Sequence, residues 1–89
     1  MMEADSYDRW RIVRLDAVDV PRPDGRGVDR LDAGEEIAVH YSADVTRRHL
    51  ARLRADPAFA RCRYEVRFVP AGSRGAGKVV HLDGEPVED

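Results

Sequence analysis

The segment Gly72-Ser-Arg-Gly-Ala-Gly-Lys78 has the G-x-x-x-x-G-K spacing of phosphate-binding loops. Such a loop cradles phosphate oxygens with its backbone N–H groups, and a Ser or Thr followed by a helix completes the site. Here Val79 follows Lys78, and the residues from Val79 to Leu82 have a strand pattern. The segment therefore predicts a flexible hairpin turn between two strands, and no cofactor is expected there.

Metal ligation would have to come from His40, His49, His81 and Cys62. Their spacing matches no known zinc signature, so we expect no metal site. His49 falls on the apolar side of a predicted helix, which favours a hydrogen-bonded histidine at the edge of the core. Cys62 falls on the apolar side of a predicted strand, where a lone cysteine is typically a small buried hydrophobe.

The sequence also contains no convincing catalytic motif. Ser6, Ser42 and Ser73 have no recognisable triad context, and the acidic pair Glu35-Glu36 stands at a strand start where solvation accounts for it. General acid–base catalysis needs carboxylates with displaced pKa values in a cleft. A chain of 89 residues has little room for a cleft of about 300 Å3 or more. The sequence predicts that this protein is not an enzyme.

Arginine is the feature that stands out. Residues 1–46 carry 6 Arg and 11 acidic residues (net −5), residues 47–78 have net +7, and residues 79–89 have net −4. The overall charge of −2 therefore hides an acidic–basic–acidic division of the chain. A basic segment of this kind is either a phosphate-binding surface or a solvated polar face, and a pI near 5.9 favours the second.

Periodicity predicts five elements that position these residues. Strands are expected over Trp10–Val20, Glu35–Tyr41, Cys62–Pro70 and Lys78–Leu82, and a helix over Val45–Ala55. The first strand has a possible phase slip at Ile12-Val13, as a β-bulge would produce. Ser42 supplies an N-cap, and Asp56-Pro57 ends the helix because the residue before proline is pushed out of the helical region. The stretch before Gly34 reads as loop, although residues 28–31 could form a helical turn.

The element order β-β-α-β-β predicts a two-layer α+β fold, a four-stranded mostly antiparallel sheet with one helix on one face. A β-grasp arrangement has this element order and is a candidate architecture. Its sulfur-carrier members end in Gly-Gly, which this chain lacks. The expected core is the set that alternation and the helical wheel place together: Ile37, Val39, Leu50, Leu53, Tyr64, Val66 and Phe68.

One domain is expected over residues 9–83, with a disordered N-terminus at 1–8 and a mobile acidic tail at 84–89. The chain has a single cysteine, an acidic N-terminus and no apolar run of about 18–20 residues, so we expect a small soluble cytoplasmic protein without membrane contact. Fourteen of the 15 basic residues are Arg and Asn and Gln are absent, a bias typical of a GC-rich bacterial genome.

One helix cannot cover both faces of a four-stranded sheet, so one face must be solvated or bound. On the third strand that face would carry Arg61, Arg63, Glu65 and Arg67. We therefore expect a non-catalytic protein-interaction module that forms a homodimer or joins a larger protein. Trp, Tyr and Arg are the usual interface anchors, which selects Trp10, Tyr41, Arg61, Arg63 and Arg67. The alternative is nucleic-acid binding, acting through Arg47, Arg48, Arg52, Arg54 and Arg74.

Overall fold

The computed structural model describes residues 6–73, 75, 77–82 and 85–86. Arg74 and most of the expected N-terminal and C-terminal tails, 1–8 and 84–89, lie outside these residues. Where the tails are described they contact the fold: the Asp8 carboxylate accepts a hydrogen bond from the Ala71 N–H, and Glu85–Pro86 form a short strand.

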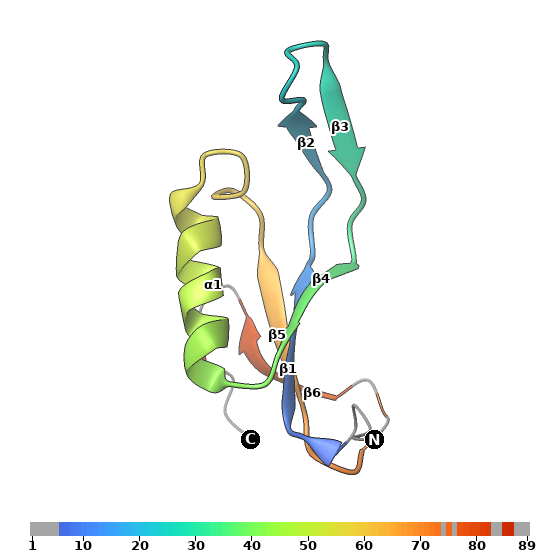
Figure 1. The fold of residues 1–89 in the computed structure, drawn as a ribbon, viewed down its shortest axis with the longest axis vertical. Helices are drawn as coiled ribbons and strands as arrows, with labels where there is room; N and C mark the ends of the chain where they lie inside the picture. The colour runs from blue at the N-terminus through green and yellow to red at the C-terminus, as the bar shows by residue number, and fades with distance from the viewer. Residues whose placement is uncertain (1–5, 74, 76, 83–84, 87–89) are drawn as a thin grey trace.

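The fold is α+β, with one helix packed on a five-stranded sheet and a separate two-stranded sheet (Figure 1). The elements are β1 (Arg9–Arg14), β2 (Val18–Pro21), β3 (Val28–Leu31), β4 (Glu35–His40), α1 (Ala43–Ala55), β5 (Tyr64–Val69), β6 (Lys78–Leu82) and β7 (Glu85–Pro86). The large sheet has the order β4-β1-β5-β6-β7 and every neighbouring pair is antiparallel. A β-grasp sheet has its first and last strands side by side and parallel, so this chain does not adopt that arrangement.

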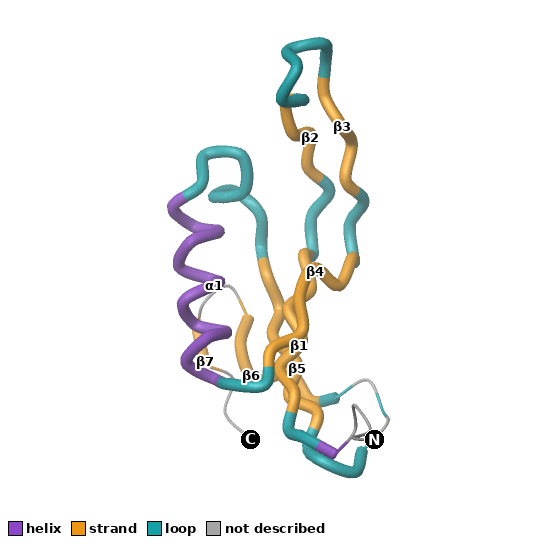
Figure 2. The backbone as a smooth tube through the Cα atoms, in the orientation of Figure 1, coloured by secondary structure: helices purple, strands orange, loops and turns teal. Residues whose placement is uncertain are grey.

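The predicted strand Trp10–Val20 is broken into β1 and β2, and a short loop over residues 15–17 leads from the main sheet to β2 (Figure 2). Residues 28–31 form strand β3 instead of the expected loop or helical turn, because they pair with β2, with Val18 opposite Leu31 and Pro21 opposite Val28. The resulting two-stranded arm projects from the body. The radius of gyration is accordingly 14.4 Å, above the roughly 12 Å of a compact chain of this length.

The predicted irregularity at Ile12-Val13 is confirmed in the pairing of β1 with β4. Ile12 lies opposite Ala38 and Val13 opposite Glu36, so the extra residue is Ile37 on β4. Ile37 therefore packs against the core, whereas Val39 is 38 % exposed on the other face. The prediction that Val39 belongs to the core is wrong, because the bulge changes the phase of β4.

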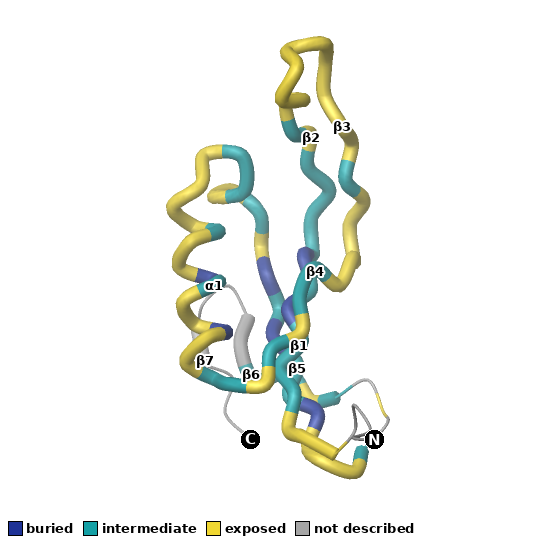
Figure 3. Tube along the Cα trace, in the orientation of Figure 1, coloured by how far each residue is buried: buried dark blue, intermediate teal, exposed yellow. Residues whose placement is uncertain are grey.

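Helix α1 begins and ends where the sequence predicts to within two residues. The Ser42 hydroxyl accepts the Val45 N–H, and Asp56 before Pro57 is extended at the other end. The helix packs on the face of the sheet that carries the core, whose buried members are Ile12, Leu50, Tyr64 and Val66 (Figure 3). No described helix is long and apolar enough to cross a membrane.

Candidate protein interfaces

The face of the sheet opposite α1 is called the open face here. Strand register assigns to it Arg9, Arg11, Val13, Glu36, Val39, Glu65, Arg67, Val69 and Val79. The expectation that the uncovered face carries Glu65 and Arg67 is met. It fails for Arg61 and Arg63, because β5 begins only at Tyr64 and the chain before it turns.

Ion pairs run across the centre of the open face. Arg11 and Arg67 lie directly opposite each other on β1 and β5, a placement that costs stability unless the charges are neutralised. The Arg11 guanidinium donates to the Glu36 carboxylate, and the Arg67 Nε donates to Glu65 Oε2 at 2.7 Å. Glu36 and Glu65 both lie opposite Val13, one rank along the strands from the two arginines. The four charges balance, so this part of the face is no phosphate-binding patch.

A hollow of about 380 Å3 opens at one end of this face. It is lined by Arg9, Arg11, Glu36, Val39, Tyr41, Val69 and Gly75. Tyr41 is 57 % exposed and its ring meets the Tyr7 ring edge-on at 5.8 Å. Arg9 donates to the Ser73 carbonyl through Nη2, while its buried Nε finds no acceptor among the described residues. An acceptor from a bound molecule is one way to satisfy such a donor.

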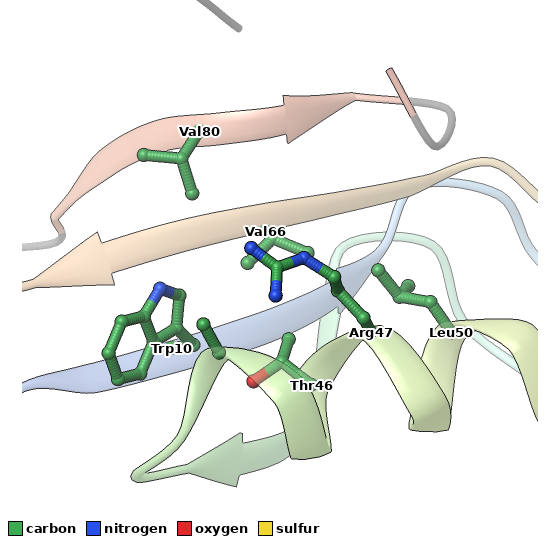
Figure 4. Close-up of a pocket in the computed structure, with 7 residues that line it drawn as sticks. Trp10, Thr46, Arg47, Leu50, Val66 and Val80 are labelled. Atoms are coloured by element: carbon green, nitrogen blue, oxygen red, sulfur yellow. The ribbon is translucent and has the colours of Figure 1, made fainter. Parts of the chain in front are cut away.

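A second hollow, the helix–sheet groove, lies on the other side of the sheet between α1 and β6 (Figure 4). It measures about 250 Å3 and is lined by Trp10, Ala43, Thr46, Arg47, Leu50, Val66 and Val80. Val80 reaches it because a second bulge, between Val66 and Arg67 in the pairing of β5 with β6, leaves Val80 without a partner on β5. The lining is apolar apart from the Arg47 guanidinium and the Thr46 hydroxyl, which donates to the Ser42 carbonyl at 2.8 Å.

The predicted site residues are divided among several surfaces. Trp10 and Arg47 line the helix–sheet groove, Tyr41 and Arg67 lie at the open face, and Arg48 and Arg52 lie on the outer side of α1 beside Val45. Arg54 and Arg61 are exposed, and Arg63 is bound at the base of the arm. The described arginines therefore do not form one patch.

The base of the arm is held by a buried cation that the sequence does not reveal. Arg14 is only 2 % exposed. Its guanidinium donates to the carbonyls of Asp16 (3.0 Å) and Asp32 (2.7 Å) and to the Glu35 carboxylate (3.2 Å). Asp16 and Asp32 stand just before β2 and just after β3, so this one side chain joins the two ends of the arm.

Asp16 also ties the arm to the main sheet. Its carboxylate accepts from the backbone N–H of Arg63 at 2.8 Å and from the Arg63 side chain at 2.9 Å. These hydrogen bonds, the side-chain bonds foremost, lower the pKa of Asp16 to about 2. The contact is therefore present wherever Asp16 is ionised, and it weakens only as pH falls from the ordinary aspartate range toward 2.

A histidine pair joins the helix to the sheet. His40 Nε2 on β4 and His49 Nδ1 on α1 are 2.8 Å apart, and their rings are nearly perpendicular. This confirms the prediction of a hydrogen-bonded histidine at the edge of the core. Such a bond requires one ring nitrogen to donate its N–H and the other to accept it, so it is lost when both rings are imidazolium cations. Burial, followed by the charges of His40 and Arg52, lowers the pKa of His49.

Stability is expected to fall below about pH 6.5, because the unfolded chain then takes up a proton that His49 resists in the folded protein. The stabilisation linked to neutral His49 is fully present above the pKa that His49 has in the unfolded chain. It is lost as pH falls toward the lower pKa that His49 has in the folded protein. Urea unfolding of wild type and His49→Gln at pH 7.5 and 5.5 measures this, and the variant should lose less stability on acidification. Equal losses in the two proteins would show that the pair does not control the response.

Within the part of the chain that the structure describes, three groups have displaced pKa values, and none of them lines either hollow. Asp16 and His49 are explained above, and burial raises the pKa of Tyr64 to about 12 while its hydroxyl donates to the Phe59 carbonyl. The predicted phosphate-loop look-alike, Gly72 to Lys78, joins β5 to β6, as expected for a hairpin turn. The helix–sheet groove offers apolar surface and arginine, and the hollow on the open face adds the Glu36 carboxylate and Tyr41.

Residues not predicted for these surfaces include Arg9, Arg11 and Glu36 at the open face and Leu50, Val66 and Val80 in the groove. The alternation of Arg9, Arg11 and Val13 along one strand is the signal that places them on one face. Searches with the whole chain found no matching family model, curated protein or solved structure.

Proposed function

We propose that this protein is a small non-catalytic interaction module that self-associates through its open face. The observation that carries the proposal is that the only described helix packs on the other side of the sheet, so most of this strand layer has no cover, with Val69, at 2 % exposure, buried at one end. That layer presents Val39 and Tyr41, at 38 % and 57 % exposure, beside its ion pairs. Of the residues predicted to form an interface, Arg67 and Tyr41 lie on this surface.

Charge complementarity favours a second copy as the partner. Arg11 and Arg67 lie opposite each other on this face, and Glu36 and Glu65 lie in the next rank of residues along the strands, on either side of Val13. When two such faces meet displaced by one rank along the strands, the carboxylates of one copy lie close to the guanidinium groups of the other. Pairing of this kind sets orientation and rate more than affinity.

The size of the face predicts a weak dimer. Four strands spaced about 4.8 Å apart, five or six residues long at about 3.4 Å per residue, give roughly 400 Å2 per copy and 800 Å2 in total. That total is below the roughly 1,200–2,000 Å2 of stable specific interfaces, so the association is expected to be weak and transient. A dissociation constant of tens of micromolar or weaker is therefore expected.

Light scattering coupled to size exclusion should give a mass that rises with concentration from 10.0 kDa toward about twice that value. Val39→Glu should keep the chain monomeric, because the new carboxylate would be buried in the interface, while Arg11 on the neighbouring strand can pair with it in the monomer. Val45→Glu is the matched control: Val45 has nearly the same exposure, 37 %, and lies on the outer side of α1.

A mass of 10.0 kDa at every concentration would contradict self-association. Equal weakening by both variants would contradict the assignment to the open face. In the first case a larger protein becomes the partner to seek, since the face would still lack a cover. A cytoplasmic, bacterial setting completes the proposal, supported by the single free cysteine and the arginine-rich composition.

Nucleic-acid binding is the second candidate. It is favoured by the exposed arginines Arg48 and Arg52 on the outer side of α1, with Arg54 on the same helix. Anisotropy titrations of a labelled oligonucleotide decide between the two functions, because phosphate binding weakens steeply as salt increases. No binding at low salt would remove this candidate.

A further inference from the structure

The helix–sheet groove exists because α1 covers only part of its side of the sheet. The contacts of α1 go chiefly to β1 and β4, so the β5–β6 side of that face is not covered by the helix. Trp10 and Val80, both partly buried, form the wall there, and the buried Val66 and Leu50 form the floor between them and the helix (Figure 4). The Trp10 ring is held in place by Phe68, whose centroid lies 5.0 Å away.

The charge at the groove is basic. Arg47 is the helix arginine that lines it, and Lys78 at the start of β6 lies opposite Phe68 on the same side of the sheet. Arg47 extends from α1 into the space between Trp10 and Leu50 (Figure 4). Its pairing with Asp44 at 2.8 Å is solvent-exposed, so it is weak and can yield to another carboxylate.

The volume indicates the kind of occupant. At about 250 Å3 the groove is smaller than the roughly 300–1,000 Å3 typical of small-molecule sites. It is large enough for one bulky apolar side chain or two smaller ones. An apolar floor with a cation at its rim is complementary to an apolar side chain that has a carboxylate close to it.

We propose that the helix–sheet groove binds an acidic peptide segment of a partner protein, with a bulky apolar side chain on Trp10, Val66 and Val80 and a neighbouring carboxylate on Arg47. The groove lies on the opposite side of the sheet from the open face and would bind a different partner. Peptide binding there does not depend on self-association through the open face.

Trp10 makes the test direct, because it is the only tryptophan in the chain and lines the groove. The probes are short amidated peptides with one central Leu, Met or Phe flanked by two Asp on each side, and the same peptides with Lys in place of Asp. The acidic peptides should change the Trp10 fluorescence saturably at concentrations below about 1 mM, and the Lys peptides should not. Binding should weaken as salt increases.

Two matched pairs of variants locate the site. Arg47→Gln should weaken acidic-peptide binding about tenfold through loss of a charge-assisted hydrogen bond, whereas Arg48→Gln, on the outer side of α1, should leave it within twofold. Ala43→Leu should fill the groove and abolish the response, whereas Ala51→Leu, also on the outer side, should not.

The proposal is overturned if all three acidic peptides leave Trp10 fluorescence unchanged, if the Lys peptides bind equally well, or if the members of either matched pair behave alike. Circular dichroism of each variant separates lost binding from lost folding. The two proposals can fail separately. Arg47→Gln should leave self-association, measured by light scattering, unchanged. Val39→Glu should leave peptide binding, measured by Trp10 fluorescence, unchanged.

Discussion

Replacing Arg14 with methionine is expected to lower the free energy of unfolding by about 3 kcal/mol. Methionine retains much of the apolar stem, so the loss reflects the three hydrogen bonds of the guanidinium. The carbonyls of Asp16 and Asp32 would lose their donor at a buried position. Glu35 is half exposed, so water compensates its carboxylate and keeps the cost below that of a fully buried ion pair.

The loss should be concentrated in the arm. Hydrogen exchange should show the amides of β2 and β3 losing protection before those of β1 and β5, because an unsupported two-stranded hairpin is marginal at best. Arg30→Met is the control: Arg30 is on the same arm, and its ion pair with Asp19 is solvent-exposed and worth about 0.5 kcal/mol. Urea unfolding that gives the same loss for both variants would show that Arg14 does not hold the arm.

Gly77→Ala is expected to cost about 3 kcal/mol or more, for two reasons that act together. Gly77 has φ +86°, which disfavours any side chain, and an added Cβ would lie 2.6 Å from Val69 Cγ2 and 2.8 Å from the Phe68 carbonyl oxygen. The backbone oxygen cannot turn away as a side chain would. The turn between β5 and β6 would have to move, and with it the Gly77 carbonyl that accepts from Arg67.

Gly72→Ala measures the backbone strain without the steric clash. Gly72 has nearly the same φ, +84°, but nothing lies within 4 Å of an added Cβ. Its cost should therefore be the strain alone, about 1 kcal/mol. Thermal and urea unfolding of the two variants side by side measure the difference, and equal losses would mean that the turn adjusts without resistance.

The arm is held at its base and carries ion pairs between its two strands. Arg14, Asp16 and Arg63 fix it to the main sheet, while the arm itself buries almost nothing. Its charges are paired across the strands, Arg22 with Asp29 and Arg30 with Asp19. A ribbon with balanced charge has no excess positive surface for a phosphate backbone, which agrees with a protein partner better than with nucleic acid.

Local signals were sufficient for the elements themselves. Ser42 and Asp56-Pro57 delimit α1, because a cap and a proline act within one turn of the chain. Strict alternation identified β5, and its buried residues Tyr64 and Val66 were correctly assigned to the core. The irregularity at Ile12-Val13 was also visible, because two successive apolar residues interrupt the alternation.

The tertiary structure decided which side each residue faces and which strands pair. Ile37 and Val39 are separated because the extra residue of the bulge falls on β4, a choice set by pairing with β1. Strand β3 exists only because β2 lies beside it, since its own residues carry no strong strand pattern. Arg14 is buried because three acceptors converge on it from positions up to 21 residues away.

The candidate surfaces show the same division. The sequence by itself determined an α+β chain with one helix, and therefore a sheet with an uncovered face. It also indicated that Tyr41 and the helix arginines would lie at the surface, but not that Arg14 would be buried. Only the tertiary structure placed Trp10 in a groove behind the sheet, Tyr41 at the open face and Arg63 at the base of the arm. Alternation along a strand defines two faces but not which one meets the helix, and that choice depends on packing between segments distant in sequence.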